Sequence, residues 1–210
     1  MRILFRMAYP KRIEEVGTYH HINSVGVFGA TVFRDDDDRA TFLRLLEEEL
    51  ERSKWSCLSY TVMTTHYHVL VKLTEPSLST GFQRLNGRFA RAMNARHGRR
   101  GALWQRRFYD KYVESQFHLL EVTRYIALNA PRANMKPKAE DWPWCSYGST
   151  VGLASPDPLI DEGAILGLFS RDVAQARAKY RKFVEEGDPR VRRSQIRIRD
   201  LSETAGFNEH

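Results

Sequence analysis

Hydrophobic and polar positions alternate along residues 17–27, 55–63 and 66–73, and these segments are rich in β-branched and aromatic residues. Successive side chains of a strand point to opposite faces of a sheet, so the alternation predicts three strands with one face toward a core. Because the second and third segments are close together in the sequence, they are expected to pair as antiparallel neighbours. The pattern over residues 103–114 indicates a further extended segment.

Between these strands, apolar residues recur at helical spacing. One buried stripe steps by three or four residues through Leu78, Phe82, Leu85, Phe89 and Met93. Another helix is expected after the aspartates at 35–38, which suit helix capping and the helix dipole better than metal binding. Later helices are predicted over residues 115–130, 161–169 and 171–186, with irregular structure over 137–158.

The helix over residues 115–130 has a start and a stop signal. Ser115 can cap its first turn. Pro131 lacks an amide hydrogen and biases Ala130 away from helix, so the helix is expected to end there. The resulting order is strand, helix, two strands, helix, strand, helix. This order predicts an α+β fold: a ferredoxin-like or RRM-like antiparallel sheet with helices on one face, followed by a C-terminal helical extension.

Composition narrows the classes of protein that fit. The chain has 210 residues, 42% of them hydrophobic, and a formal net charge of +7, which favours an anionic partner. Its two cysteines are too few for a disulfide framework or a cysteine zinc site. We find no apolar run long enough for a membrane span and no signal peptide, so we expect a cytoplasmic protein without a membrane partner.

The segment from Met63 to Val71 carries the first candidate chemistry, a His-x-His pair. Residues two apart in a strand share a face, so His66 and His68 should project together and could bind a divalent ion with a third ligand. Two other classes of His-rich site do not fit. A metallo-hydrolase run would need Asp and His where the chain has Leu70 and Val71, and a histidine-triad hydrolase would need a third His at position 70.

A second group of candidates lies on the helix over residues 115–130. Tyr125 and Asn129 are four residues apart and share a face, and Glu121 lies one turn earlier, as a possible auxiliary group. A tyrosine hydroxyl can attack phosphorus when a metal polarises the phosphate, and Asn129 could be an oxygen ligand of that metal. The alternative is an amphipathic tyrosine that packs between helix and sheet with its hydroxyl in water.

The third candidate feature is the concentration of positive charge between Arg84 and Lys111. Nine basic residues and one acid, Asp110, give this segment a charge of +8. Arginines that hold phosphates and aromatic rings that stack on bases together fit single-stranded nucleic acid, whereas a solvated helix face over core aromatics is the plainer explanation. The candidate nucleic-acid-binding residues are Arg84, Arg88, Arg91, Arg99, Arg100, Trp104, Arg106, Arg107 and Lys111.

Several ordered motifs resemble one known family. They are Gly17 to His21, Phe33 with the following aspartates and Arg39, His66 to His68, Gly98 to Arg107, Arg124 to Asn129, Arg132-Ala133, and Trp142 to Ser146. In this combination and spacing the chain resembles the single-tyrosine HUH transposases, specifically the REP-associated tyrosine transposases of the IS200-like group. It departs from their usual pattern at Thr64-Thr65, where Pro-Asn is common, and at Pro131, which is displaced by one position.

The resemblance implies a catalytic domain over residues 17–135, between a lead-in at 1–16, a helical extension at 136–187 and a basic flexible tail at 188–210. It implies an enzyme that nicks and transfers single-stranded DNA near REP-like hairpins, through a 5′-phosphotyrosine link. By position, Tyr125 takes the role of nucleophile, and His66, His68 and Asn129 that of ligands to Mg²⁺ or Mn²⁺.

Other functions stay open at this stage. A domesticated, catalytically silent module could grip single-stranded nucleic acid on the same sheet without cutting it. Replication initiators and relaxases share the His pair but usually carry larger additional domains. A basic structural or toxin-like protein is a weaker rival. The resemblance allows a monomer that uses its own tyrosine or a homodimer that donates it in trans, and its REP-associated branch favours the monomer.

Overall fold

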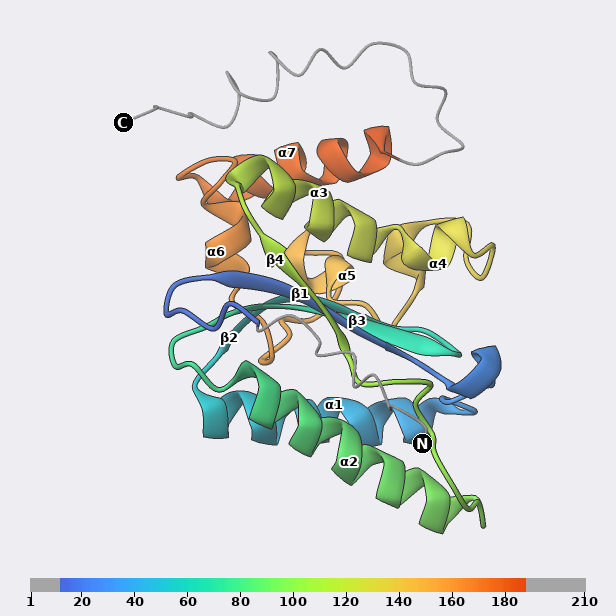
Figure 1. Ribbon diagram of the computed structural model, residues 1–210. Coiled ribbons are helices and arrows are strands. Elements are labelled where there is room, and N and C mark those ends of the chain that lie inside the picture. The colour runs from blue at the N-terminus through green and yellow to red at the C-terminus, as the bar shows by residue number, and fades with distance from the viewer. Residues whose placement is uncertain (1–11, 188–210) are drawn as a thin grey trace, which may run out of the picture.

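The structure is a computed structural model that describes residues 12–187. The tail predicted for residues 188–210 and most of the predicted lead-in lie outside the described residues. Figure 1 shows a central sheet with a layer of helices on each side. No helix within residues 12–187 is long and apolar enough to cross a membrane.

Four antiparallel strands form the sheet in the order β2-β3-β1-β4. Their bounds are β1 (Tyr19–Val25), β2 (Ser56–Val62), β3 (His66–Lys72) and β4 (Tyr109–Val113). The predicted pairing of the segments 55–63 and 66–73 is confirmed by β2 and β3. The extended segment predicted over residues 103–114 is shorter than expected, because Leu103 and Phe108 turn into the core before the strand begins.

Two long helices, α1 (Asp36–Ser53) and α2 (Leu78–Arg96), cover one face of the sheet. The capping role expected of the aspartate run is confirmed, since the side chain of Asp35 accepts a hydrogen bond from the backbone N–H of Asp38. The predicted stripe of α2 is buried against this face, together with Tyr67, Val69 and Val71 of β3. These two helices form the layer that the α+β layout predicts on one face, whereas the third helix of the predicted order, over residues 115–130, lies on the other face.

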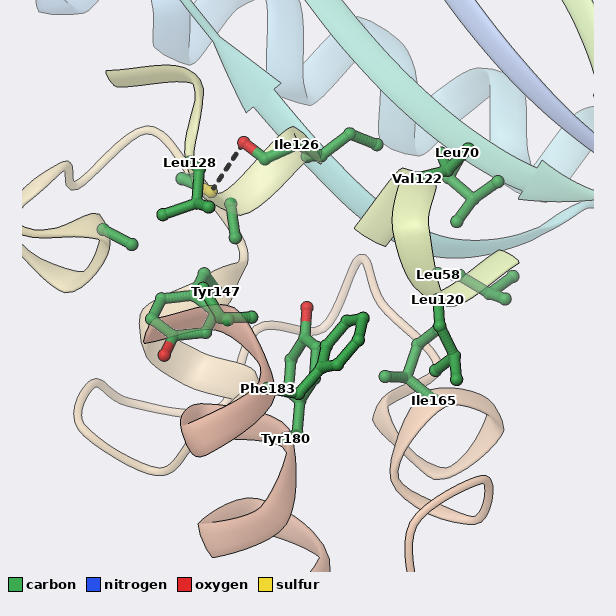
Figure 2. Packing of buried hydrophobic residues seen from close by; sticks show 14 of the residues in the cluster. Leu58, Leu70, Leu120, Val122, Ile126, Leu128, Tyr147, Ile165, Tyr180 and Phe183 are labelled. Carbon is green, nitrogen blue, oxygen red and sulfur yellow. Dashed lines mark hydrogen bonds between the residues drawn. The ribbon is translucent and has the colours of Figure 1, made fainter. Parts of the chain in front are cut away.

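The other face is covered by α3 (Gln116–Ala127) and by the C-terminal extension. The extension contains η2 (Ala139–Asp141), α5 (Tyr147–Thr150), α6 (Glu162–Leu166) and α7 (Val173–Glu186). Figure 2 shows how Leu120 and Ile126 of α3 pack with Tyr180 and Phe183 of α7 in one buried cluster. The same cluster contains Leu70 of β3, so the extension and the sheet share a hydrophobic core around α3.

The end of α3 differs from the sequence-based expectation. The helix stops at Ala127 rather than Ala130, and a separate turn, α4 (Asn129–Arg132), follows. Pro131 lies inside this turn and does not end it. A proline is tolerated in the first turn of a helix because the amide hydrogens there have no helical partner. The break at Leu128 therefore starts a new helical turn with its own first residues, beginning at Asn129.

Candidate functional site

The two histidines of β3 lie on the sheet face that α3 covers. Leu70, two residues further along the same strand, packs against α3, whereas Tyr67 and Val69 belong to the core on the other face. The rings of His66 and His68 have their centroids 5.1 Å apart at an interplanar angle of 82°. The i, i+2 spacing thus brings the two imidazoles together on one face of the sheet.

Helix α3 places Tyr125 over this pair. The Tyr125 ring lies edge-on to that of His68, with centroids 5.2 Å apart. The next residue, Ile126, is fully buried in the cluster that anchors α3, while Tyr125 is 40% exposed. The hydroxyl-bearing ring is therefore fixed by its helix and still open to a substrate from solvent.

Asn129 reaches the same site from the first residue of α4. Its amide nitrogen donates a hydrogen bond to the backbone carbonyl of Tyr125 over 3.1 Å. That bond turns the amide oxygen toward His66, whose Nε2 lies 3.4 Å from Asn129 Oδ1. The break between α3 and α4 keeps Asn129 beside Tyr125, so the four-residue spacing works although the helix does not continue through it.

His21 of β1 completes the group, and the sequence did not identify it as a site residue. Its Nε2 lies 2.9 Å from His68 Nδ1, and its ring centroid is 5.8 Å from that of Tyr125. His21 and His68 are diagonal neighbours across the β1–β3 pairing, because His68 is opposite Asn23. Only the register of this pairing brings the two rings together, and no local pattern reveals that register.

Burial keeps the three imidazoles neutral. Desolvation, assisted by electrostatic interactions with Lys111 and His118, lowers the pKa of His21 to about 4. Desolvation also lowers the pKa of His66. The pKa of His68 lies well below its ordinary value, because of desolvation first and then of electrostatic interactions with His21 and His66. A neutral imidazole has one nitrogen lone pair free for a metal ion or a hydrogen bond.

The donor atoms suit a divalent ion. The Nδ1 of His66 is 3.0 Å from Thr65 Oγ1, and the Nδ1 of His68 faces His21. The Nε2 of His66 is hydrogen-bonded to Asn129 Oδ1, so an ion that binds both of these atoms would replace this hydrogen bond. Asn129 Oδ1 thus lies beside His66, and the ring of His68 is 5.1 Å from that of His66. Within residues 12–187 no cluster of three or more His, Cys, Asp or Glu could hold a metal, so such a site depends on the amide of Asn129.

Glu121 is occupied by a different partner. Both of its carboxylate oxygens accept hydrogen bonds from Arg124 Nη2, and the Arg124 guanidinium also stacks on Phe183 of α7 at 4.3 Å. Glu121 therefore helps to join α3 to the extension. A direct role of Glu121 beside Tyr125 stays a prediction.

Helix α2, which carries Arg84, Arg88 and Arg91, covers the sheet face opposite to α3 (Figure 1), and the histidines lie on the face that α3 covers. Arg84 makes hydrogen bonds through two of its nitrogens to Glu49 of α1, and Arg88 pairs with Glu48 of the same helix. The sequence had indicated that this segment lacks counter-charges, but α1 supplies them from 35 to 40 residues away. Arg91 is exposed on α2. The structure does not bring these three arginines together with Tyr125.

Of the other candidate nucleic-acid-binding residues, one packs in the core and the rest lie in a strand and a loop. Trp104 packs against Phe33, Tyr67 and Phe89 and donates a hydrogen bond to the carbonyl of Asn86, so most of its ring is taken up by the core. Lys111 of β4 is paired with His21 in the sheet and is exposed. The remaining arginines, Arg99, Arg100, Arg106 and Arg107, lie in the loop between α2 and β4.

Comparisons with known proteins show which family and which fold the chain matches. Residues 17–129 match the family model described as transposase IS200 like. The fold resembles that of a REP-associated tyrosine transposase solved bound to a REP hairpin, with a TM-score of 0.57 and 15% identity over 80% of this chain and 93% of that one. A putative transposase from Deinococcus radiodurans is 18% identical, with a TM-score of 0.41, over 60% of this chain and 98% of that one.

No curated protein matches the sequence. The family match nevertheless covers more than half of the chain, from the first strand through the helix that carries Tyr125 to Asn129. The chain therefore belongs to the IS200-like transposase family and has a transposase-type, DNA-processing role.

Proposed function

We propose that the protein is a single-stranded DNA endonuclease and strand transferase that forms a 5′-phosphotyrosine through Tyr125. The observation that carries the proposal is the exposed Tyr125 ring, 5.2 Å from the ring of neutral His68 and on the same site as the His66–Asn129 pair. A nucleophile that is open to solvent beside buried metal-binding donors is an arrangement suited to phosphoryl transfer.

The step is a transesterification. Tyr125 Oη forms a bond to the scissile phosphorus and loses its proton to solvent, the bond from phosphorus to the 3′ oxygen breaks, and the departing oxygen takes a proton. One phosphodiester bond replaces another, so no nucleotide hydrolysis is needed, and a 3′-hydroxyl can reverse the step to join strands. Since α3 is anchored in the core, it holds Tyr125 in place while the phosphate is brought to it.

Mg²⁺ or Mn²⁺ is the proposed cofactor, held by His66, His68 and Asn129. The bound ion would polarise a non-bridging oxygen of the phosphate. The protein contributes three neutral donors, two of them on a rigid central strand and one tied to the backbone of Tyr125. The nucleophile and the donor set are thus held to each other by the hydrogen bond from Asn129.

The substrate that we propose is single-stranded DNA next to a hairpin, by analogy with the REP hairpin bound by the solved transposase. The purified protein would be incubated with labelled hairpin oligonucleotides, with and without Mn²⁺, and resolved on a denaturing protein gel. A covalent adduct that requires Mn²⁺ is the expected result. Tight retention of every hairpin without an adduct would instead indicate the catalytically silent binding module.

Lys111 is an exposed basic residue that lies beside His21 in the sheet, and we propose that it helps to hold the strand. Lys111→Gln is expected to weaken binding and to lower the slope of log affinity against log salt by about one. Fluorescence anisotropy across a salt series measures both. Arg91→Gln makes the same charge change on the opposite face, and an equal effect of that variant would show that the strand also uses α2.

We further propose that each subunit uses its own tyrosine, because Tyr125 already stands over the histidines of the same chain. A mixture of Tyr125→Phe and His66→Ala proteins is then expected to stay inactive, since each active site lacks one essential group. Adduct formation on a labelled hairpin measures this. Recovery of cleavage in the mixture would indicate a homodimer that exchanges its tyrosine helices.

A further inference from the structure

His21 is a buried polar residue that the proposed chemistry does not use. Its side chain and that of His68 are hydrogen-bonded, with Nε2 of His21 2.9 Å from Nδ1 of His68, and the two residues are only 8% and 5% exposed. Both rings also touch the ring of Tyr125 edge-on. His21 is therefore packed against both the candidate metal ligand and the candidate nucleophile.

The direction of this hydrogen bond has chemical consequences. If His68 carries its proton on Nδ1, it donates to His21 and presents a free lone pair on Nε2. If His21 donates instead, the proton of neutral His68 must sit on Nε2, where it blocks coordination. The two tautomers of one pair thus correspond to a binding and a non-binding form of His68.

We propose that His21 is a positioning residue that accepts the Nδ1–H of His68 and so presents His68 Nε2 to the divalent ion. This inference rests on the proposed function. Metal-bound histidines generally donate their second ring hydrogen to a fixed acceptor, most often a carboxylate or a backbone carbonyl. Here the acceptor is a neutral imidazole, which fixes the tautomer and ring orientation without adding negative charge to the site.

The surroundings of His21 support the role of acceptor. The residue opposite His21 on β4 is Lys111 and not an acid. Asp110, the acid next to Lys111, is instead bound by His20, which points to the other face of β1. The nitrogen of His21 that faces His68 is Nε2, 2.9 Å from His68 Nδ1, so it is the atom that would accept the Nδ1–H of His68.

Two substitutions at position 21 and one control test the inference. His21→Leu keeps the approximate volume but removes the acceptor, whereas His21→Gln keeps an oxygen that can accept from His68. His118→Leu removes a neighbouring histidine whose Nδ1 accepts instead from the backbone of Glu114. Calorimetric titration with Mn²⁺ gives the affinity of each variant, and long-range ¹H–¹⁵N correlation spectra of the metal-free proteins report the His68 tautomer.

The expected result is a loss of Mn²⁺ affinity of about 10- to 100-fold in His21→Leu, with recovery to within about threefold in His21→Gln and no change in His118→Leu. The spectra should show His68 protonated on Nδ1 in the parent protein and in His21→Gln, and a mixture of tautomers in His21→Leu. His68 protonated on Nε2 in the parent, or equal Mn²⁺ affinity in all variants, would overturn the inference.

Failure of the nuclease proposal gives a different pattern. If the parent protein forms no adduct but His21→Leu still loses Mn²⁺ affinity, the positioning role stands and the proposed reaction does not. If the parent protein forms the adduct and all variants bind Mn²⁺ alike, the reaction stands and His21 is a packing residue only.

Discussion

Replacement of Tyr125 by phenylalanine is expected to abolish the covalent adduct and strand cleavage, with a fall in rate of at least about 10³-fold. The substitution removes one oxygen atom and keeps the ring, so its edge-on contacts with His21 and His68 should persist. Since the ring is partly exposed and its hydroxyl makes no hydrogen bond within residues 12–187, folding should be unaffected. The expected change in affinity for hairpin DNA is less than about twofold, because phosphate contacts dominate such binding.

Tyr109→Phe is the matched control for this experiment. Tyr109 is 46% exposed at the start of β4, so the same atom is removed from a similarly open tyrosine. Cleavage and adduct formation should be unchanged in that variant. Full adduct formation by Tyr125→Phe would refute the assignment of the nucleophile, and loss of activity in both variants would point to a general effect of tyrosine hydroxyls on DNA binding.

Substitution of His66 by alanine is expected to remove metal-dependent nicking, with a fall in activity of roughly 10²-fold or more at a fixed low Mn²⁺ concentration. The variant loses one of three donors and leaves Asn129 Oδ1 without its nitrogen neighbour. His66 is only partly buried, at the start of β3, so the sheet should tolerate the change. Initial cleavage rates across a Mn²⁺ series measure the effect.

The dose dependence separates a loss of metal binding from a loss of structure. A weakened site should regain activity as Mn²⁺ is raised, whereas a damaged fold should not, and thermal unfolding provides an independent check. His118→Leu, which alters a histidine of α3 that bonds elsewhere, should behave as the parent protein. An unchanged requirement for Mn²⁺ in His66→Ala would argue against His66 as a ligand.

Part of the site could be predicted from the sequence because it depends on local geometry. The i, i+2 relation of a strand places His66 beside His68, and the four-residue spacing places Asn129 beside Tyr125 although α3 ends at Ala127. His21 could not be found in this way. It is adjacent to His20, which points to the opposite face and is hydrogen-bonded to Asp110. The local sequence does not indicate which of these two histidines contacts His68 of β3.

The prediction for the basic segment, residues 84–111, was incomplete because it considered only residues close together in the sequence. A count of charge along residues 84–111 includes no partner that lies elsewhere in the sequence. The antiparallel packing of α1 and α2 brings Glu48 and Glu49 to Arg88 and Arg84, and a sum over one segment cannot reveal this. Trp104 was proposed as a stacking platform because of its neighbours in sequence, but its neighbours in space are the aromatic rings of the core.

The shared core of α3 and α7 has a consequence for how such a protein can diverge. The helix that carries Tyr125 rests on Tyr180 and Phe183, which lie beyond the part of the chain that defines the family. Drift in the size of these supporting side chains would tilt α3 and move the tyrosine relative to the histidines, while every reactive group stayed the same. If Tyr125 acts as proposed, residues of the C-terminal extension would therefore influence the geometry of the reaction without belonging to any catalytic motif.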